Sequence, residues 1–303
     1  MRMLGVSLVA GVMATLSALA QVSVEVMLDQ EQFLAGEALP LAVRISNRSG
    51  QTLRLGGDDD WLSVSVETRD HGVVSKLGDP PVRGEFTLES SQRATRRVDI
   101  APYFNLGRQG AYRAQVTVKI AQWNQQFSST PVSFDIITGA RVWEREFGVP
   151  QPETNTPPEV RKYTLMQANY LKKGLKLYLR ITDAEEAKVF RVFALGPVVS
   201  FAQPEAQIDP RCNLHVLCQT GRTTYSYTVA NPDGDVLVRQ THEISGNRPR
   251  LQVGEHGKVA VVGGARRYAD DDFPPREPFA KPAEAALLPP PAAVTNTLDT
   301  AKP

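Results

Sequence analysis

Residues 110–120 read Gly-Ala-Tyr-Arg-Ala-Gln-Val-Thr-Val-Lys-Ile, and this stretch decides the fold class of the N-terminal half. From Tyr112 onward its apolar side chains recur at every second position, with polar side chains between them. Successive side chains of an extended strand point to opposite faces, so this period of two places the apolar groups on one face. The stretch therefore predicts a strand of an antiparallel sheet with one face buried and the other in water.

The same alternation recurs in four further stretches, at residues 22–28, 39–45, 62–66 and 132–136. Turn-forming residues separate them, as in Asn47-Arg48-Ser49-Gly50, where Asn and Gly tolerate the backbone angles of a tight turn. Short strands divided by such turns are typical of two antiparallel sheets packed face to face. We therefore expect an all-β protein whose residues 21–138 form a β-sandwich.

Three short motifs resemble secreted bacterial immunoglobulin-like domains: Phe33-Leu34-Ala35-Gly36-Glu37, Leu41-x-Val43-x-Ile45-x-Asn47 and Leu106-x3-Gly110-x-Tyr112. In that family the Gly-Glu turn opens the second strand, and Gly-x-Tyr begins the strand that carries the tyrosine corner. The resemblance implies an immunoglobulin-like sandwich, and it implies no particular ligand because such folds host many functions. The Cys…Trp…Cys pattern of antibody domains is absent from the sequence.

The first 20 residues carry the pattern of a secretory signal. Met1-Arg2 precedes an apolar run that ends in Ala18-Leu19-Ala20, the small-x-small pattern of a signal-peptidase site. We expect cleavage of residues 1–20 and a periplasmic or secreted protein that begins at Gln21. The alternative is an uncleaved anchor, because the 18-residue run reaches the lower limit for a membrane span. No membrane span is expected after residue 20.

Composition narrows the classes of partner. The chain has 34 basic and 33 acidic side chains and a net charge of +1, so nucleic acid is not an expected partner. Hydrophobic residues make up 42% of the sequence, which is enough to build a core. Two cysteines are too few for a scaffold held together by disulfides.

Two segments lack strand periodicity. Residues 139–159 contain the short amphipathic stretch 142–147, followed by prolines at 150, 152, 157 and 158, and we expect them to form a connector and a stiff linker between two domains. Residues 269–303 accumulate prolines without aliphatic periodicity, which predicts a disordered tail.

Residues 160–268 again alternate as strands do, with four aliphatic runs that begin at 189, 214, 236 and 259. Each repeat unit is about one hairpin long. The segment Asp209-x4-Leu214-His215-Val216-Leu217, with Tyr225-x-Tyr227 after it, resembles the hairpins of β-propeller blades. Because the stretch is too short for a closed propeller, we expect a second antiparallel β domain: an open meander, a small sandwich, a barrel, or a piece completed by a partner.

Candidate metal and catalytic groups are few. On an extended strand Cys212 and Cys218 share one face and His215 points to the other, so no metal site is expected there. The acidic triplets Asp58-Asp59-Asp60 and Asp270-Asp271-Asp272 leave calcium binding open, with solvated loop charge as the alternative. There is no Gly-x-Ser-x-Gly elbow, His-Glu-x-x-His motif, phosphate loop or dinucleotide fingerprint. We therefore expect no cofactor and no enzymatic activity.

Tyr225 and Tyr227 are two positions apart, so their rings share one face of the predicted strand. If that face is exposed, the rings form an aromatic platform for a glycan or a partner protein, with Arg239 as a donor at its edge. The alternative is that both rings belong to the core.

The sequence thus predicts a non-catalytic exported protein that serves in binding, adhesion or assembly at the cell exterior. Two other functions stay open. One is an accessory or inhibitory module for an exported enzyme, and the other is a hydrolase whose site the sequence does not reveal.

Overall fold

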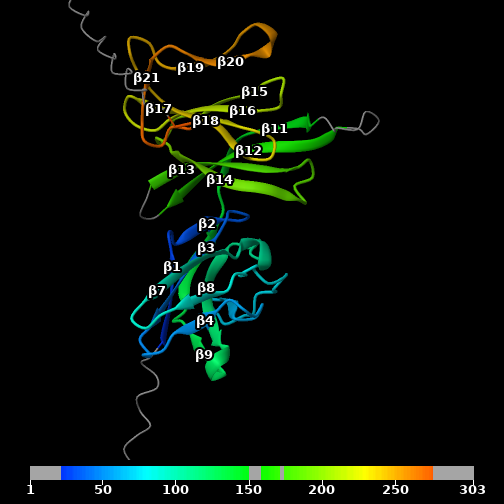
Figure 1. Ribbon diagram of the computed structural model, residues 1–303. Coiled ribbons are helices and arrows are strands. Elements are labelled where there is room, and N and C mark those ends of the chain that lie inside the picture. Colours follow the sequence, from blue (N-terminus) through cyan, green and yellow to red (C-terminus); the bar gives the residue numbers. More distant parts are fainter. Residues whose placement is uncertain (1–21, 150–157, 171–173, 276–303) are drawn as a thin grey trace, which may run out of the picture.

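The computed structural model describes residues 22–149, 158–170 and 174–275, and the predicted signal segment lies outside these ranges. The regular structure of the described residues is β-strand with a few short 3-10 turns, and every strand pair except β2–β10 is antiparallel, which confirms the all-β class. Figure 1 shows two units stacked end to end, with the N-terminal strands at the bottom and the C-terminal strands at the top. Within the described ranges, no helix is long and apolar enough to cross a membrane.

The first unit consists of two packed sheets and a small strand pair. One sheet has the order β1 (Val22–Leu28), β3 (Pro40–Asn47), β7 (Arg93–Asp99). The other has the order β2 (Gln32–Leu34), β10 (Val132–Ile137), β8 (Gly110–Ile120), β5 (Leu62–Thr68), with β9 (Gln125–Ser128) paired to β8. The small pair is β4 (Leu53–Leu55) and β6 (Phe86–Leu88). A single apolar core lies between the sheets, as expected for residues 21–138.

Strand β8 shows the predicted alternation, because every second side chain from Tyr112 to Ile120 is buried. The hydroxyl of Tyr112 donates a 2.7 Å hydrogen bond to the backbone oxygen of Arg108, four residues earlier in the chain. The same ring stacks on Phe134 of β10 with 5.6 Å between centroids. The bond and the stacking together fix the loop before β8 against the core.

The second unit is a sandwich with a third layer. Its first sheet has the order β11 (Ala140–Val149), β12 (Glu159–Tyr170), β13 (Gly174–Asp183), β14 (Val189–Pro197). Its second sheet has the order β15 (Glu205–Ile208), β16 (Leu214–Gln219), β17 (Thr224–Ala230), β18 (Val236–Glu243), β21 (Ala265–Arg267). A core that includes Tyr163, Leu179 and Val216 joins the two sheets. The hairpin of β19 (Arg250–Val253) and β20 (Val259–Val262) packs on the far side of the second sheet.

This arrangement corrects two predictions. The four aliphatic runs do form strands, but they lie in β14, β16, β18 and β20, which belong to three different sheets, so the described residues show no arrangement of propeller blades. Residues 140–149 are not a connector, because they form β11, which pairs with β12 from its first residue to its last. The proline-rich stretch therefore joins two strands of one hairpin, and it lies outside the described residues as far as position 157.

The joint between the units is short and tightly packed. Only residues 138 and 139 separate β10 from β11. A Cβ atom on Gly139 would lie 3.2 Å from the backbone oxygen of Gln167 and from the Met166 side chain, so the close approach favours glycine. Gly36 has a φ of +85°, and a Cβ there would lie 3.2 Å from Val189 on β14. Both glycines thus let the backbone of one unit lie against the sheet of the other.

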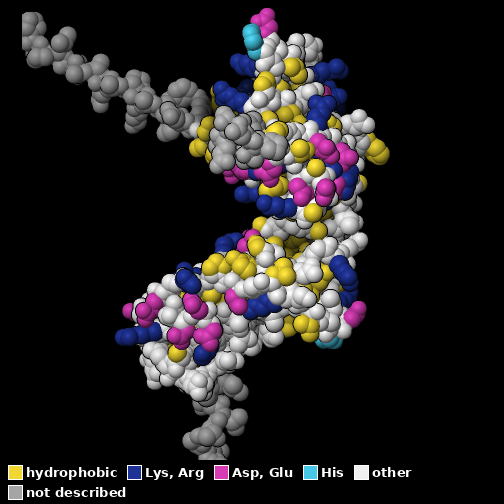
Figure 2. Space-filling model, turned by 90° about the vertical axis from the view of Figure 1, so that its right-hand side faces the viewer, with side chains coloured by type: hydrophobic (Ala, Val, Ile, Leu, Met, Phe, Trp, Pro, Cys, Tyr) yellow, Lys and Arg dark blue, Asp and Glu magenta, His cyan; other side chains and the backbone are white. Residues whose placement is uncertain are grey.

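A small apolar cluster covers this contact, with Leu34 from the first unit against Ala168, Tyr178 and Val192 of the second. Figure 2 shows the units in contact on one side and a hollow between them on the other. A cavity of about 280 Å³ lies at this boundary, between the β2–β3 turn of the first unit and residues 192–194 of β14.

The end of the described chain also differs from the predicted tail. Phe273 exchanges two backbone hydrogen bonds with Arg239 of β18, at 2.7 and 3.0 Å. Asp272 forms a 2.6 Å ion pair with Arg266, and its side chain is only 5% exposed. Residues 269–275 therefore belong to the second unit. They were predicted to be part of the tail because a segment held by one backbone bridge and one ion pair has no periodic pattern in its sequence.

Candidate functional site

The structure places Tyr225 and Tyr227 on one face of β17, as predicted, but that face is not exposed. Tyr225 is 2% exposed and Tyr227 is 8% exposed. They pack with Leu217 and Val229 beneath the β19–β20 hairpin, which supplies Leu251. The two rings therefore form core and not a surface platform, since the hairpin covers the face that the hypothesis requires to be open.

Arg239 does not accompany the two rings. It pairs with Thr228 in the β17–β18 register, and directly opposed residues point to the same face. That face is opposite to the one carrying Tyr225 and Tyr227. Arg239 therefore cannot act at the edge of the rings. Its backbone pairs with Phe273, and its side-chain Nε is buried without a hydrogen-bond partner among the described residues.

A polar chain runs through the same layer, from Asp209 through His215 to Tyr227. Asp209 Oδ2 lies 3.2 Å from His215 Nε2, and His215 Nδ1 lies 2.7 Å from the Tyr227 hydroxyl. Burial, reinforced by the Asp209 charge, raises the pKa of Tyr227 to about 12. A hydroxyl with a raised pKa holds its proton, which disfavours a nucleophilic role. Asp209 also accepts hydrogen bonds from Asn213, so the chain ties the turn before β16 to β17.

His242 lies beside this chain and makes the stability of the second unit sensitive to pH. Burial and then the positive charge of Arg266 lower its pKa below the ordinary 6.5, while the charge of Asp272 opposes them. As the pH falls below about 6.5, His242 binds a proton more readily in the unfolded chain than in the folded chain. The free energy of unfolding is therefore higher above that pH and decreases on acidification.

We expect the free energy of unfolding to fall between pH 7.5 and pH 5.5, and the His242→Leu variant to show a shallower fall. Chemical denaturation at both values measures this difference. The matched control is His256→Gln, because His256 is exposed on the same unit and its loss is expected to leave the slope unchanged. An unchanged slope in His242→Leu would contradict the assignment.

The two cysteines are free, and they do not form a site with His215. Cys212 lies in the turn before β16 with a φ of +64°, so the predicted strand begins later than the sequence indicated. Cys218 faces the core between the two sheets, whereas His215 lies on the other face of β16. Burial raises the pKa of Cys218 to about 12, which makes it a poor ligand and nucleophile.

Three of the six carboxylates in the acidic triplets pair with cations of the protein. Asp60 lies 2.7 Å from Lys119 and Asp59 lies 3.3 Å from Arg83, while Asp272 is paired as described above. Across the described residues, no group of three or more His, Cys, Asp or Glu side chains is placed to hold a metal ion.

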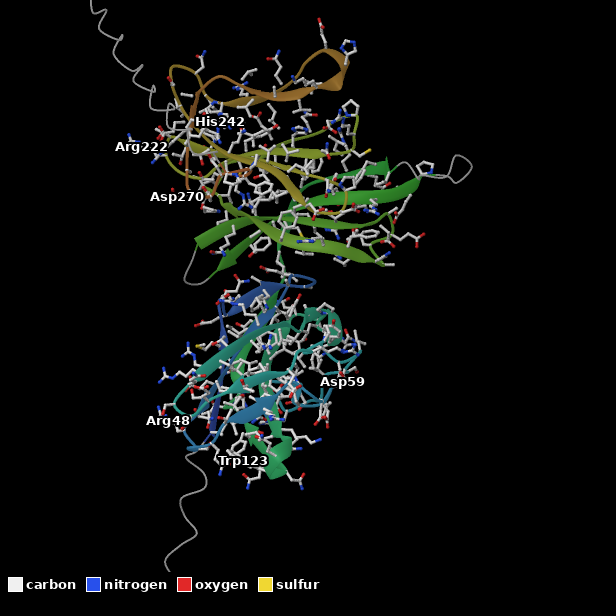
Figure 3. The ribbon with its side chains drawn as sticks, in the orientation of Figure 1. Arg48, Asp59, Trp123, Arg222, His242 and Asp270 are labelled. Atoms are coloured by element: carbon white, nitrogen blue, oxygen red, sulfur yellow. The ribbon has the colours of Figure 1, made fainter. Side chains whose placement is uncertain are left out.

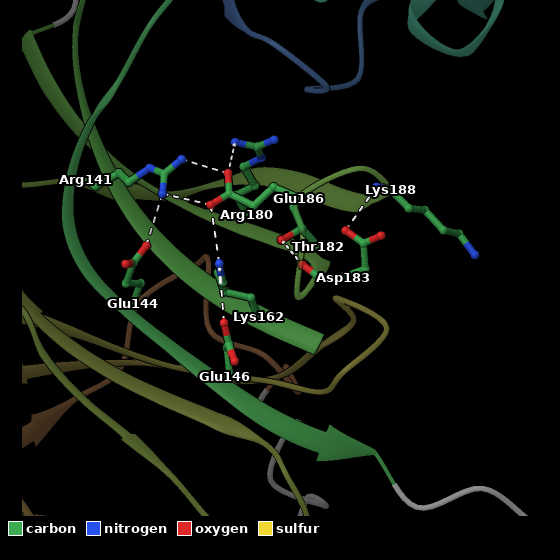
Figure 4. A network of polar contacts seen from close by, with 9 residues as sticks. All are labelled: Arg141, Glu144, Glu146, Lys162, Arg180, Thr182, Asp183, Glu186 and Lys188. Atoms are coloured by element: carbon green, nitrogen blue, oxygen red, sulfur yellow. Dashed lines mark hydrogen bonds and ion pairs between the residues drawn. The ribbon is translucent and has the colours of Figure 1, made fainter. Parts of the chain in front are cut away.

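A carboxylate surrounded by three cations lies on the outer face of the β11–β14 sheet (Figure 4). Glu186 accepts two hydrogen bonds from Arg141, at 2.7 and 2.8 Å, and lies 3.5 Å from Lys162 and 3.4 Å from Arg180. Burial opposes ionisation of Glu186, but Arg141 and the other cations lower its pKa overall. Because Glu144 and Glu146 pair with the same cations, the network is balanced in charge and serves to clamp the β13–β14 turn onto β11 and β12.

A depression of the surface lies in the second unit, where the loop between β14 and β15 meets the start of β19. It has a volume of about 640 Å³ and is lined by residues 199–205 together with Gln219, Arg248 and Arg250. We call it the loop pocket. Its size falls in the range of small-molecule sites.

The loop forms because β14 ends at Pro197 and the chain must turn back to β15. The Val199 N–H donates a 3.0 Å hydrogen bond to the Gln219 oxygen, which ties the loop to the end of β16. The Ala202 N–H then donates to the Val199 oxygen at 3.1 Å and closes a tight turn over Ser200 and Phe201. Phe201 has a φ of +70°, at a position where such turns favour glycine.

Phe201 is fully exposed, at 104% of its reference area. Burial of an aromatic side chain lowers the free energy of a protein, and a bulky residue with positive φ is strained. Neither property helps the chain to fold. Uncompensated strain of this kind clusters at functional sites, which makes Phe201 the most notable residue of the loop pocket.

Charge in the loop pocket is unbalanced. Arg248 lies over the Tyr225 ring, 5.4 Å from its centroid, and its guanidinium lies 3.9 Å from Glu205. Glu205 also accepts a 2.7 Å hydrogen bond from the Leu251 N–H, so one carboxylate positions both Arg248 and the β19 strand. Arg250 makes no ion pair with any described residue and leaves the pocket with one excess positive charge.

Comparisons with known proteins add little. No protein-family model and no curated protein matched the chain. Among solved structures it is similar to the sporulation control protein Spo0M from Bacillus subtilis, with 9% identity and a TM-score of 0.29 over 58% of this chain and 91% of that chain. A score this low supports no conclusion about fold or function.

Proposed function

We propose that the chain is an exported, non-catalytic binding protein in which an immunoglobulin-like N-terminal sandwich carries a second sandwich with the loop pocket as its ligand site. Export is supported by the signal pattern of residues 1–20. The immunoglobulin-like assignment is supported by the Gly-x-Tyr motif and by the hydrogen bond from Tyr112 to Arg108.

The observation that carries the binding role is Phe201. Its side chain is fully exposed at the rim of a large depression, and its backbone adopts a strained conformation that glycine would relieve. A ligand that covers the ring would bury its apolar surface, and this burial would stabilise the complex. The two arginines of the pocket supply directed donors for polar groups of that ligand.

We expect Phe201→Gly to leave the free energy of unfolding unchanged or raise it by up to about 1 kcal/mol, because relief of strain offsets the entropy of glycine. The same change should weaken binding of the purified protein to isolated cell-surface material at least tenfold. Sedimentation of the protein with that material, beside thermal unfolding, measures both effects.

The control for Phe201 is Val73→Ser, since Val73 is 92% exposed on the first unit, far along the sequence from the loop pocket. It should change neither stability nor binding. If Phe201→Gly lost more than about 1 kcal/mol, the ring would have a structural role. Unchanged binding by Phe201→Gly would contradict the loop pocket as the ligand site.

A further inference from the structure

The chemistry of the loop pocket specifies a ligand class, and this inference rests on the proposed binding function. We infer that the loop pocket binds an acidic saccharide, with the sugar face on Phe201 and a carboxylate on Arg250. The observations that support each half of this assignment are independent of one another.

The lining favours a sugar over a peptide. A peptide partner needs a buried apolar anchor pocket, whereas the loop pocket is open and offers mainly polar groups around one exposed ring. Ser200 and Gln203 carry hydroxyl and amide groups that can both donate and accept hydrogen bonds. Gln219 adds an acceptor through its side-chain oxygen, since its Nε2 already donates to the backbone oxygens of Gly221 and Arg222. A sugar ring matches this set, because it has an apolar C–H face for the Phe201 ring and hydroxyls along its edge.

The charge favours an acid over a neutral sugar. Arg248 is already occupied, since the Tyr225 ring and Glu205 hold its guanidinium in place. Arg250 is exposed and has no carboxylate partner within the described ranges. Guanidinium groups bind carboxylates through two parallel hydrogen bonds, so Arg250 offers a vacant bidentate donor in the pocket that Phe201 also lines.

The spacing of the two arginines in the sequence supports the same role. Arg248 and Arg250 flank Pro249, which is buried and fixes the backbone between them. Arg250 begins β19, whose next residue, Leu251, is held by Glu205. The donor thus stands on a strand and not on a free loop, so little ordering is needed when a ligand binds.

The test uses the mature protein and three carboxylated oligosaccharides, built from galacturonate, from glucuronate with N-acetylglucosamine, and from N-acetylmuramate with N-acetylglucosamine. Each is paired with its carboxyl-reduced, neutral form. Calorimetry is expected to show binding of at least one acid that is tenfold or more weaker for the reduced form. Arg250→Gln should remove this preference, and higher salt should weaken binding of the acid more than of the neutral form.

Arg222→Gln is the matched control, because Arg222 is exposed near the pocket, does not line it, and extends into solvent at the end of the second unit (Figure 3). Its affinity should equal that of the wild type. Equal binding of acidic and reduced sugars that still depends on Phe201 would overturn the acidic assignment and leave the binding function intact. Binding of no saccharide, with capture of cell-surface material still lost in Phe201→Gly, would overturn the saccharide class alone. Binding of no saccharide, together with unchanged capture of cell-surface material by Phe201→Gly, would overturn both the saccharide class and the binding function.

Discussion

Alanine in place of Tyr225 or Tyr227 is expected to lower the free energy of unfolding by roughly 3–5 kcal/mol, as for other large aromatic side chains removed from a core. Both rings lie between the second sheet and the β19–β20 hairpin and are less than a tenth exposed. Their removal leaves a cavity that the hairpin and the sheet can fill only in part, so the cost includes lost contacts as well as lost burial.

Urea denaturation of the two variants measures this loss. The control is Tyr268→Ala, because Tyr268 is 61% exposed on the same unit, and its change should stay within about 1 kcal/mol, the size of an exposed cation–π contact such as the one its ring makes with Arg266. Tyr227→Phe separates packing from hydrogen bonding: it keeps the ring, but leaves His215 Nδ1 without its 2.7 Å partner and should cost about 1–3 kcal/mol. Near-wild-type stability of both alanine variants would mean that the rings are surface groups after all.

Arg266→Met is expected to cost about 3–5 kcal/mol, because it leaves the Asp272 carboxylate buried without its cation. The side chain of Asp272 is 5% exposed and its partner lies 2.6 Å away. Arg266 also donates a 2.9 Å hydrogen bond to the Thr241 oxygen, so its loss removes a second contact with β18, while the backbone bonds between Phe273 and Arg239 remain.

The double variant Arg266→Met with Asp272→Leu should recover much of that loss, since a buried ion pair replaced by apolar groups of similar size is often close to neutral. Denaturation of the two single variants and the double variant completes the cycle. If the double variant were as unstable as Arg266→Met alone, the ion pair would not be the source of the effect.

The sequence predicted five strands of the first unit from their alternating apolar residues, and it did not mark β2, β4, β6 and β9, whose three or four residues carry too little pattern. The alternating apolar residues of β1, β5, β8 and β10 all fall within strands, at nearly the expected bounds. Strand β11 was not predicted as a strand because it lies at the edge of its sheet and most of its residues, such as Arg145, are exposed. Only the rings of Trp143 and Phe147 pack against the core, which is too few for a clear alternation. Its proline-rich continuation then suggested a linker where the chain makes a hairpin.

The candidate site was beyond prediction from local pattern. Tyr225 and Tyr227 were correctly placed on one face, but only the tertiary position of residues 250–262 decides that this face is covered. Phe201 stands in a loop without periodicity, and neither its φ nor its exposure leaves a mark in the sequence. The one available signal was Arg248-Pro249-Arg250, two cations held apart by a rigid residue.

The glycine contacts between the two units have a mechanical consequence. Gly36 and Gly139 let the backbone lie close to the sheet of the second unit, but the shared apolar cluster is small and a hollow lies beside it, so only a small area opposes a change of angle between the units. A pull on a ligand in the loop pocket would pass to the first unit through the two-residue connection between β10 and β11 and through the cluster of Leu34, Tyr178 and Val192. The short connection limits how far the ligand can move from the N-terminal sandwich, while the small contact limits its angle only weakly.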